Sequence, residues 1–366
     1  PELPDVNGVD DLVGLWGPER VLELFDSAKP ASAIEFRQTD LGNAERLVAT
    51  FGADLLYCGK RDCWFVYDGC RWAPDEGREL DKLANRAIRE AYSDAGQIED
   101  ATRRKQFLQF LFRSESHRAL TAMVQRARSL ARKVEPAELD ADPWLLNAPN
   151  GVVDLRTGAL HPHARDLLMS RMAGAPYQPE GRCPMFERFL ARIMGISPDA
   201  SEGELEGAER LVSYLQKVFG YAATGSVVEQ AMFVFYGTGN NGKTTLLEVI
   251  RAALGDYAGS IQVDTLTTRE RDNSVNTDLA DLCGKRMVCS SECEDGRRLA
   301  VARVKHLTGM ATLKARRLRE NMFEWQPTHK LFLDTNYKPV IRGIEEATWE
   351  RMHCVPFRVT IPPAER

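Results

Sequence analysis

The fold is decided by AMFVFYGTGNNGKTT, residues 231–245. An apolar run of the kind found in buried strands, residues 231–236, enters a glycine-rich segment that satisfies the pattern G-x-x-x-x-G-K-[ST]. The next residues, 246–254, place their apolar side chains at helical spacing, and Gly255 follows directly. A strand, a glycine-rich loop and a helix in this order predict a phosphate-binding loop in an α/β fold.

The loop contains the residue types that phosphate binding needs. Glycines allow consecutive backbone N–H groups to turn inward around phosphate oxygens, and the helix N-terminus adds its positive dipole. Lys243 would place its charge on the β- and γ-phosphates, and the Thr244 hydroxyl could ligate Mg²⁺. A glycine-rich surface turn is the alternative, but it would need neither the strand nor the helix. We therefore expect ATP and Mg²⁺ as cofactors, held by Gly237, Thr238, Gly239, Asn240, Asn241, Gly242, Lys243, Thr244 and Thr245.

A second apolar run, residues 286–291, is followed by Glu292 and Glu294. ATP hydrolysis needs one acid that holds Mg²⁺ and one base that orients the attacking water. Extended backbone puts residues two apart on the same side of a strand. We expect Glu292 to serve the metal, while the base is either Glu292 or Glu294. Exposed carboxylates at a strand end are the alternative.

Two further strands adjoin polar residues that suit ATP hydrolysis. The apolar strand predicted over residues 330–335 leads to Asn336, whose amide could reach both the γ-phosphate and the attacking water. A turn-forming asparagine before Lys338 is the alternative. Arg351 precedes a fourth predicted strand, residues 352–357, and its guanidinium could serve the ATP of a neighbouring subunit.

Together these motifs resemble the replicative primase–helicases of phages, plasmids and poxviruses, whose C-terminal part is a superfamily 3 helicase. The matching motifs lie at residues 237–245, 287–292, 305–309, 330–336 and 349–351. Residues 41–47 and 146–158 are similar to the helicase-associated N-terminal region of that family. The resemblance covers residues 38–360.

The resemblance implies an AAA+-like ATPase that forms a ring, expected to be a hexamer, and translocates on single-stranded DNA in the three-prime to five-prime direction. Lys243 and Thr244 match the residues that hold phosphate and Mg²⁺, and Glu292 matches the acid of the second motif. Many members place two adjacent acids there, but this chain has Ser291 before Glu292. The departure is one reason why the base is not assigned to a single glutamate.

Three more roles follow from the same resemblance. Asn336 matches the sensor residue, and Arg351 matches an arginine finger that acts on the neighbouring subunit. Lys305 resembles a second basic residue that reaches across the subunit interface.

Basic residues gather between residues 297 and 319, where the sequence has eight of them and no acid. The stretch runs towards residues 323–325, so a hairpin is expected, and in the family resembled this insertion lines the central pore. Cations grip a phosphate backbone without reading bases, which predicts sequence-tolerant and salt-sensitive binding. A solvated basic hairpin is the alternative. The candidate DNA contacts are Lys314, Arg316, Arg317 and Arg319.

The expected fold class is α/β: an AAA+-like P-loop ATPase with a central parallel sheet, preceded by an α+β N-terminal helicase-associated domain and a helical segment. We expect a winged-helix-like region of the family to be missing after the last residue, and the resemblance implies a primase or polymerase module upstream of Pro1. The expected parts are a lead segment (1–37), the N-terminal domain (38–180), a helical collar or linker (181–224), the ATPase domain (225–358) and the start of a C-terminal region (359–366).

Composition sets the broad class. The 366 residues are 43% hydrophobic and 28% charged, and no run approaches the roughly 20 apolar residues that cross a bilayer, which excludes a disordered or membrane-spanning protein. The net charge of −5 argues against nucleic acid wrapped over the whole surface, so DNA contacts have to be local. Eight dispersed cysteines favour reduced thiols and a place in the cytoplasm of the host cell.

These observations favour an ATP-dependent replicative DNA helicase of a phage, plasmid or integrated element. Its expected partners are single-stranded DNA, further copies of itself in a ring, a primase or polymerase module and other replication proteins, with no membrane. The alternative is a nucleotide-regulated assembly or loading factor that binds DNA without unwinding it, and such a switch could dispense with Arg351 and Lys305. A small-molecule P-loop kinase would need neither the basic hairpin nor Asn336.

Overall fold

The chain divides into two compact units. The computed structural model describes residues 17, 36–76, 78–267, 277–291, 299–309, 312–315, 322–338 and 349–365. The first unit comprises Pro1–Val66 and Pro74–Val134, and the second comprises Tyr67–Ala73 and Glu135–Arg366. Residues 135–180, which we expected in the N-terminal domain, are therefore grouped with the ATPase part of the chain.

The first unit packs helices against a small sheet. β1 (Leu55–Cys58) pairs antiparallel with β2 (Cys63–Tyr67) and parallel with β4 (Arg132–Lys133). Leu47, Ile88 and Met123, from three different helices, share one buried cluster with side chains of this sheet. The helices are α3 (Asp40–Phe51), α4 (Glu79–Asp94), α5 (Ala101–Ser114) and α6 (His117–Leu130).

The second unit is built on a five-stranded parallel sheet in the order β14-β8-β13-β10-β9. β8, which leads into the glycine-rich loop, lies between β13 and β14. The apolar runs of the sequence become these strands because both faces of a parallel sheet are buried, and the predicted α/β class with a central parallel sheet is confirmed. The strands are β8 (Met232–Tyr236), β9 (Ala258–Ser260), β10 (Met287–Ser291), β13 (Lys330–Thr335) and β14 (Met352–Pro356).

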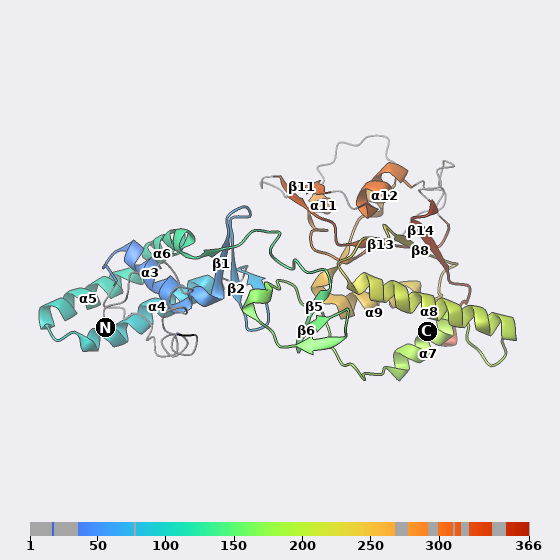
Figure 1. The fold of residues 1–366 in the computed structure, drawn as a ribbon, viewed down its shortest axis with the longest axis horizontal. Helices are drawn as coiled ribbons and strands as arrows, with labels where there is room; N and C mark the ends of the chain where they lie inside the picture. The colour runs from blue at the N-terminus through green and yellow to red at the C-terminus, as the bar shows by residue number, and fades with distance from the viewer. Residues whose placement is uncertain are drawn as a thin grey trace. The chain divides into compact units, whose positions relative to one another are not determined.

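Helices cover both faces of this sheet (Figure 1). Because side chains alternate along a strand, Phe233 and Phe235 of β8 enter one buried cluster, whereas Met232 and Val234 enter the other. Burial of each such side chain contributes about 1.5–3 kcal/mol to stability. The cluster on one face is completed by α7 (Pro184–Met194), α8 (Glu202–Ala223) and α9 (Lys243–Leu254), and that on the other by α12 (Val301–Thr308).

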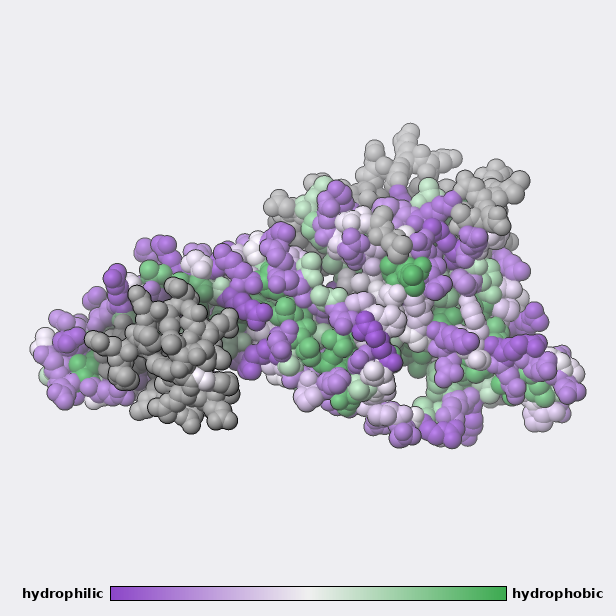
Figure 2. All heavy atoms as spheres, in the orientation of Figure 1, coloured by the Kyte–Doolittle hydropathy of each residue, from purple (hydrophilic) through white to green (hydrophobic). Residues whose placement is uncertain are grey.

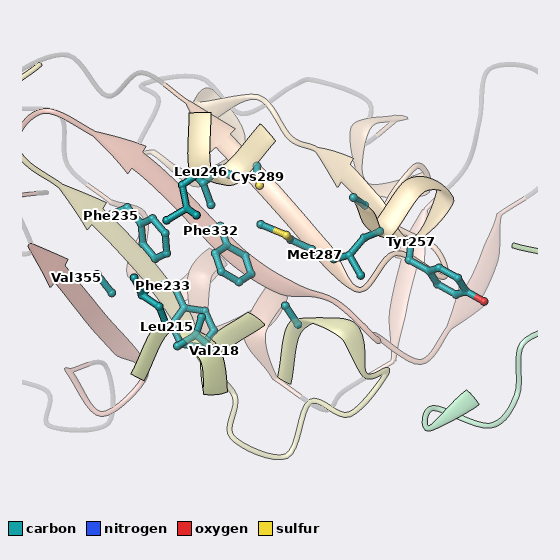
Figure 3. Packing of buried hydrophobic residues seen from close by; sticks show 14 of the residues in the cluster. Leu215, Val218, Phe233, Phe235, Leu246, Tyr257, Met287, Cys289, Phe332 and Val355 are labelled. Carbon is teal, nitrogen blue, oxygen red and sulfur yellow. The ribbon is translucent and has the colours of Figure 1, made fainter. Parts of the chain in front are cut away.

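The helix α8 lies within the segment that we expected as a collar or linker. Figure 3 shows its Leu215 and Val218 beside Phe233 of the sheet. Phe332 of β13 joins the same cluster, with its ring centroid 5.0 Å from that of Phe233. The helix is therefore part of the core of the second unit.

Smaller elements complete this unit. Arg286 ties the meander β5-β6-β7 to the sheet, since its guanidinium donates to the Leu145 carbonyl oxygen at 2.6 Å and to that of Ala223 at 2.7 Å. The minor elements of this unit are β5 (Leu145–Ala148), β6 (Gly151–Asp154), β7 (Ala159–His161), α10 (Val263–Leu266), α11 (Thr277–Ala280), β11 (Leu313–Ala315) and β12 (Phe323–Trp325). The short strand β3 (Trp72–Pro74) is instead an edge strand of the sheet that contains β1, β2 and β4.

Hydrophilic residues cover most of the described surface on the face drawn in Figure 2, between smaller apolar areas. Within the described ranges, none of the helices combines the length and the apolar composition needed to cross a membrane.

Candidate nucleotide-binding site

The glycine-rich loop joins β8 to α9 at the carboxyl end of the sheet. Gly242, directly before α9, has a φ of 82°, a left-handed conformation that strains a residue with a Cβ. Gly237 lies so close to Phe357 that an added Cβ would be 2.2 Å from the Phe357 carbonyl oxygen. The first turn of α9 presents N–H groups that have no helical acceptor, which is what an anion site requires. The backbone geometry thus explains both glycines of the motif.

Lys243 is buried, with 4% of its surface exposed, and oxygens surround its ammonium group. Its Nζ donates to the Gly237 carbonyl oxygen at 2.8 Å, to Asn241 Oδ1 at 3.0 Å and to Asn336 Oδ1 at 3.4 Å. Burial lowers the pKa of Lys243, and the charge of Asp334 opposes that shift. The structure therefore brings together two predicted site residues, Lys243 and Asn336, that are far apart in sequence.

Asp334 of β13 is a site residue that the sequence reasoning missed. Its Oδ2 accepts a hydrogen bond from Thr244 Oγ1 at 2.6 Å, and its Oδ1 lies 3.9 Å from Lys243 Nζ. The available signal was an acid inside a predicted apolar strand, because a carboxylate is buried only where it has partners.

The described residues fit a nucleoside triphosphate with Mg²⁺. The loop glycines, the helix N-terminus and the Lys243 ammonium suit phosphate. The Thr244 hydroxyl is a hard oxygen donor of the kind that Mg²⁺ prefers, and Asp334 accepts its hydrogen. The predicted acids Glu292 and Glu294 lie outside the described residues, directly after β10, which is the neighbour of β13 in the sheet.

Comparisons with known proteins match two parts of the chain to two families. Residues 44–195 match the family described as "D5 N terminal like", and residues 235–351 match a family of unknown function, DUF5906. The chain is 28% identical over 221 residues to a protein of Acanthamoeba polyphaga mimivirus named "Putative helicase", with 60% of this chain and 22% of that protein covered. It is 27% identical over 222 residues to an African swine fever virus protein named "Putative primase", with 58% and 22% covered.

The chain resembles primase–helicases of the superfamily 3 type. The resemblance expected from the motifs is thereby confirmed. The chain spans about a fifth of the length of the two viral proteins, 22% in each case. Among solved structures, the apo C-terminal region of NrS-1 has a TM-score of 0.51 at 12% identity, with 88% of this chain and 62% of that chain covered, which shows a shared fold.

Arg351 lies away from the phosphate loop of its own chain and contacts the helix that carries Lys305. The Arg351 carbonyl oxygen accepts the Met232 N–H at 2.7 Å, at the start of β8, whereas the loop follows the end of β8. Five residues of extended strand span roughly 16 Å, which exceeds the reach of an arginine side chain. The Arg351 guanidinium donates to Thr308 Oγ1 at 3.3 Å, and Thr308 lies one turn after Lys305 on α12. The structure therefore places these two predicted residues near each other.

The predicted basic hairpin is present in part, as β11 and β12. Lys314 of β11 is 60% exposed and its Nζ lies 2.6 Å from Glu324 Oε1, directly across the hairpin on β12. An exposed ion pair of this kind contributes at most about 1 kcal/mol. The other predicted DNA contacts, Arg316, Arg317 and Arg319, lie outside the described residues.

Proposed function

We propose that the chain is the helicase part of a replicative enzyme that hydrolyses ATP to move along single-stranded DNA. The observation that supports this most strongly is the convergence of Lys243, Thr244 and Asn336 at one edge of the sheet. A sensor amide on the strand beside the loop can transmit the gain or loss of a γ-phosphate to the rest of the fold.

The chemistry follows from the positions of these side chains. Bound Mg²⁺ would neutralise charge on the β- and γ-phosphates. Lys243 would turn its ammonium from the Asn241 and Asn336 oxygens to phosphate oxygens. The Asn336 amide, released from Lys243, would orient the attacking water, and Glu292 or Glu294 would accept its proton as the general base.

A ring would complete the site, and we propose a hexamer. Arg351 and Lys305 would serve the ATP of the neighbouring subunit, which the separation along β8 favours over action within one chain. The hairpin with Lys314 and the arginines that follow it would grip DNA in the pore. Further partners would be a primase or polymerase module and other replication proteins, in the cytoplasm of a host that carries a phage, plasmid or integrated element.

The decisive experiment measures the ATPase rate with and without single-stranded DNA, together with the mass of the assembly. We expect a ring whose ATPase rate rises when DNA is added. A monomer whose turnover ignores DNA would contradict the helicase proposal, provided that the chain has been compared with versions extended at both ends.

Mixed assemblies test action between subunits. Arg351→Ala and Lys243→Ala chains are each expected to be inactive alone. In a mixture, an intact Arg351 can face an intact Lys243 across an interface, so some ATPase activity should return. In the control, the Arg351→Ala chain is mixed with a chain that carries both Lys243→Ala and Arg351→Ala. This mixture has no intact Arg351, so its ATPase activity should not return. If the first mixture recovers no more activity than the control, the role of Arg351 in trans is contradicted.

A further inference from the structure

Asp334 is a buried carboxylate in the strand beside the phosphate loop. Only 8% of its surface is exposed, and every residue of β13 is buried. One carboxylate oxygen accepts the Thr244 hydroxyl hydrogen at 2.6 Å, and the other lies 3.9 Å from Lys243 Nζ. Both contacts go to residues of the phosphate-loop motif at the start of α9, so this strand provides a negative charge beside Thr244 and Lys243.

The residues paired with Asp334 in the two neighbouring strands are not acids. In the two neighbouring strands its partners are Ser291 of β10 and Phe235 of β8, and neither has a carboxylate. Among these paired residues, Asp334 is therefore the acid beside the loop. The sequence pattern had indicated acids only after β10.

The contact with Thr244 has a chemical consequence. A threonine hydroxyl that binds a metal does so through an oxygen lone pair, so its hydrogen must be donated to another acceptor. Asp334 Oδ2 is that acceptor here, which leaves the lone pairs of Thr244 Oγ1 available. Outer acceptors of this kind orient a metal ligand and raise its basicity.

We propose that Asp334 is a positioning residue for Mg²⁺: it fixes the Thr244 hydroxyl as a metal ligand. This inference rests on the proposed ATP site and adds to it a supporting residue on β13. Asp334 acts through Thr244, so its substitution should weaken the contribution of the metal to nucleotide binding more than it weakens nucleotide binding itself.

The test measures binding of the non-hydrolysable analogue AMPPNP by calorimetry, once with Mg²⁺ and once with EDTA. For Asp334→Ala we expect the Mg²⁺-dependent gain in affinity to fall by about 10- to 100-fold, the usual range for loss of an outer acceptor. Affinity in EDTA should change less than about threefold. Asp334→Asn, which keeps the side-chain shape and an acceptor oxygen, should show a smaller loss of the same kind and covers the case in which Asp334→Ala does not fold.

Two further variants separate this role from a general structural one. Asp140 also accepts a hydroxyl hydrogen bond, from Ser170 in the same unit, so Asp140→Asn is a matched control that should keep the full Mg²⁺ dependence. The double variant Thr244→Ala, Asp334→Ala should lose no more of the Mg²⁺-dependent gain in AMPPNP affinity than Thr244→Ala alone, because Asp334 acts through Thr244.

Each outcome decides a different claim. Equal losses with Mg²⁺ and with EDTA, or additive losses in the double variant, would overturn the positioning role. Retention of the full Mg²⁺ dependence by the Asp334 variants would overturn it as well, while the ATP site would stand. Failure of the unaltered chain to bind AMPPNP in either buffer would overturn the proposed function together with this inference.

Discussion

Two lysines are buried at the two ends of the central sheet, and they are held in different ways. Lys330 begins β13 and is 1% exposed, whereas Lys243 follows the loop at the far edge and is 4% exposed. Burial lowers the pKa of both side chains. Exposure and the direction of the pKa shift therefore do not distinguish them.

The acceptors around each ammonium group do distinguish them. Lys330 Nζ donates only to main-chain carbonyl oxygens among its described hydrogen bonds: those of Thr224, Ser226 and Thr328. Lys243 Nζ has one carbonyl acceptor, Gly237, and two side-chain amides, Asn241 and Asn336.

The difference shows what makes a buried lysine available to a ligand. Backbone carbonyl groups can move only if the chain moves, so Lys330 is fixed as part of the fold. An asparagine side chain can rotate away, so phosphate oxygens can replace two of the three acceptors of Lys243. The kind of acceptor, rather than burial, indicates a binding residue.

The largest expected effect is that of Lys243→Ala on hydrolysis. We expect ATPase activity to fall about 10³-fold, the upper range for removal of one preorganised donor. The thermal unfolding temperature should stay within a few degrees, because the backbone of the loop is unchanged. Lys217→Ala, on the exposed side of α8, is the control and should keep full activity. An active Lys243→Ala enzyme would contradict the claim that Lys243 is the ligand-binding lysine of the two.

Lys330→Met should have the opposite profile. It leaves three carbonyl oxygens without a donor, and we expect the free energy of unfolding to fall by about 3 kcal/mol, measured by urea titration. Nucleotide affinity of the folded protein should stay within about threefold. A large loss of affinity at unchanged stability would show that the Lys330 end of the sheet also takes part in nucleotide binding.

A pH-dependent effect of intermediate size is expected beside Lys330. Burial, followed by the charge of Lys330, lowers the pKa of His329 from 6.5 to about 4. The folded state therefore favours neutral His329, so its full stability is present above pH 6.5 and is lost as the pH falls towards 4. We expect a loss of about 2 kcal/mol by about pH 5, at roughly 1.4 kcal/mol per pH unit.

The measurement is the urea unfolding free energy of the unaltered chain and of His329→Phe between pH 7 and pH 5. Carboxylates contribute equally to both proteins, so the difference in slope reports His329. Parallel pH profiles would contradict the lowered pKa.

The smallest effect is expected for an exposed lysine, Lys314. Lys314→Ala should change the unfolding free energy by less than about 0.5 kcal/mol, since its ion pair with Glu324 is exposed. Affinity for single-stranded DNA should fall severalfold at low salt, and the slope of log K against log salt should decrease by about 1. Glu324→Gln releases Lys314 and should raise DNA affinity at low salt. Unchanged binding in both variants would contradict a role for this hairpin.

Local patterns predicted the elements of the site but not all of its members. The loop, β8 and α9 follow from consecutive residues, because glycine spacing and apolar periodicity are local properties. Asn336 was also predictable, since a polar residue after an apolar strand marks the end of that strand. Asp334 was missed because nothing near it in sequence indicates that Thr244, 90 residues away, donates to it.

The phosphate loop, the apolar strands and the two glycines that the loop backbone needs can all be predicted from local sequence patterns, because each depends on neighbouring residues. The order of the strands emerges from the folded sheet. It brings Asp334 to Thr244 and Arg351 to the helix of Lys305, and it surrounds Lys330 with three carbonyl acceptors. The physical reason is that pairing between strands distant in sequence depends on packing of the whole sheet and both of its covered faces, which no local pattern encodes.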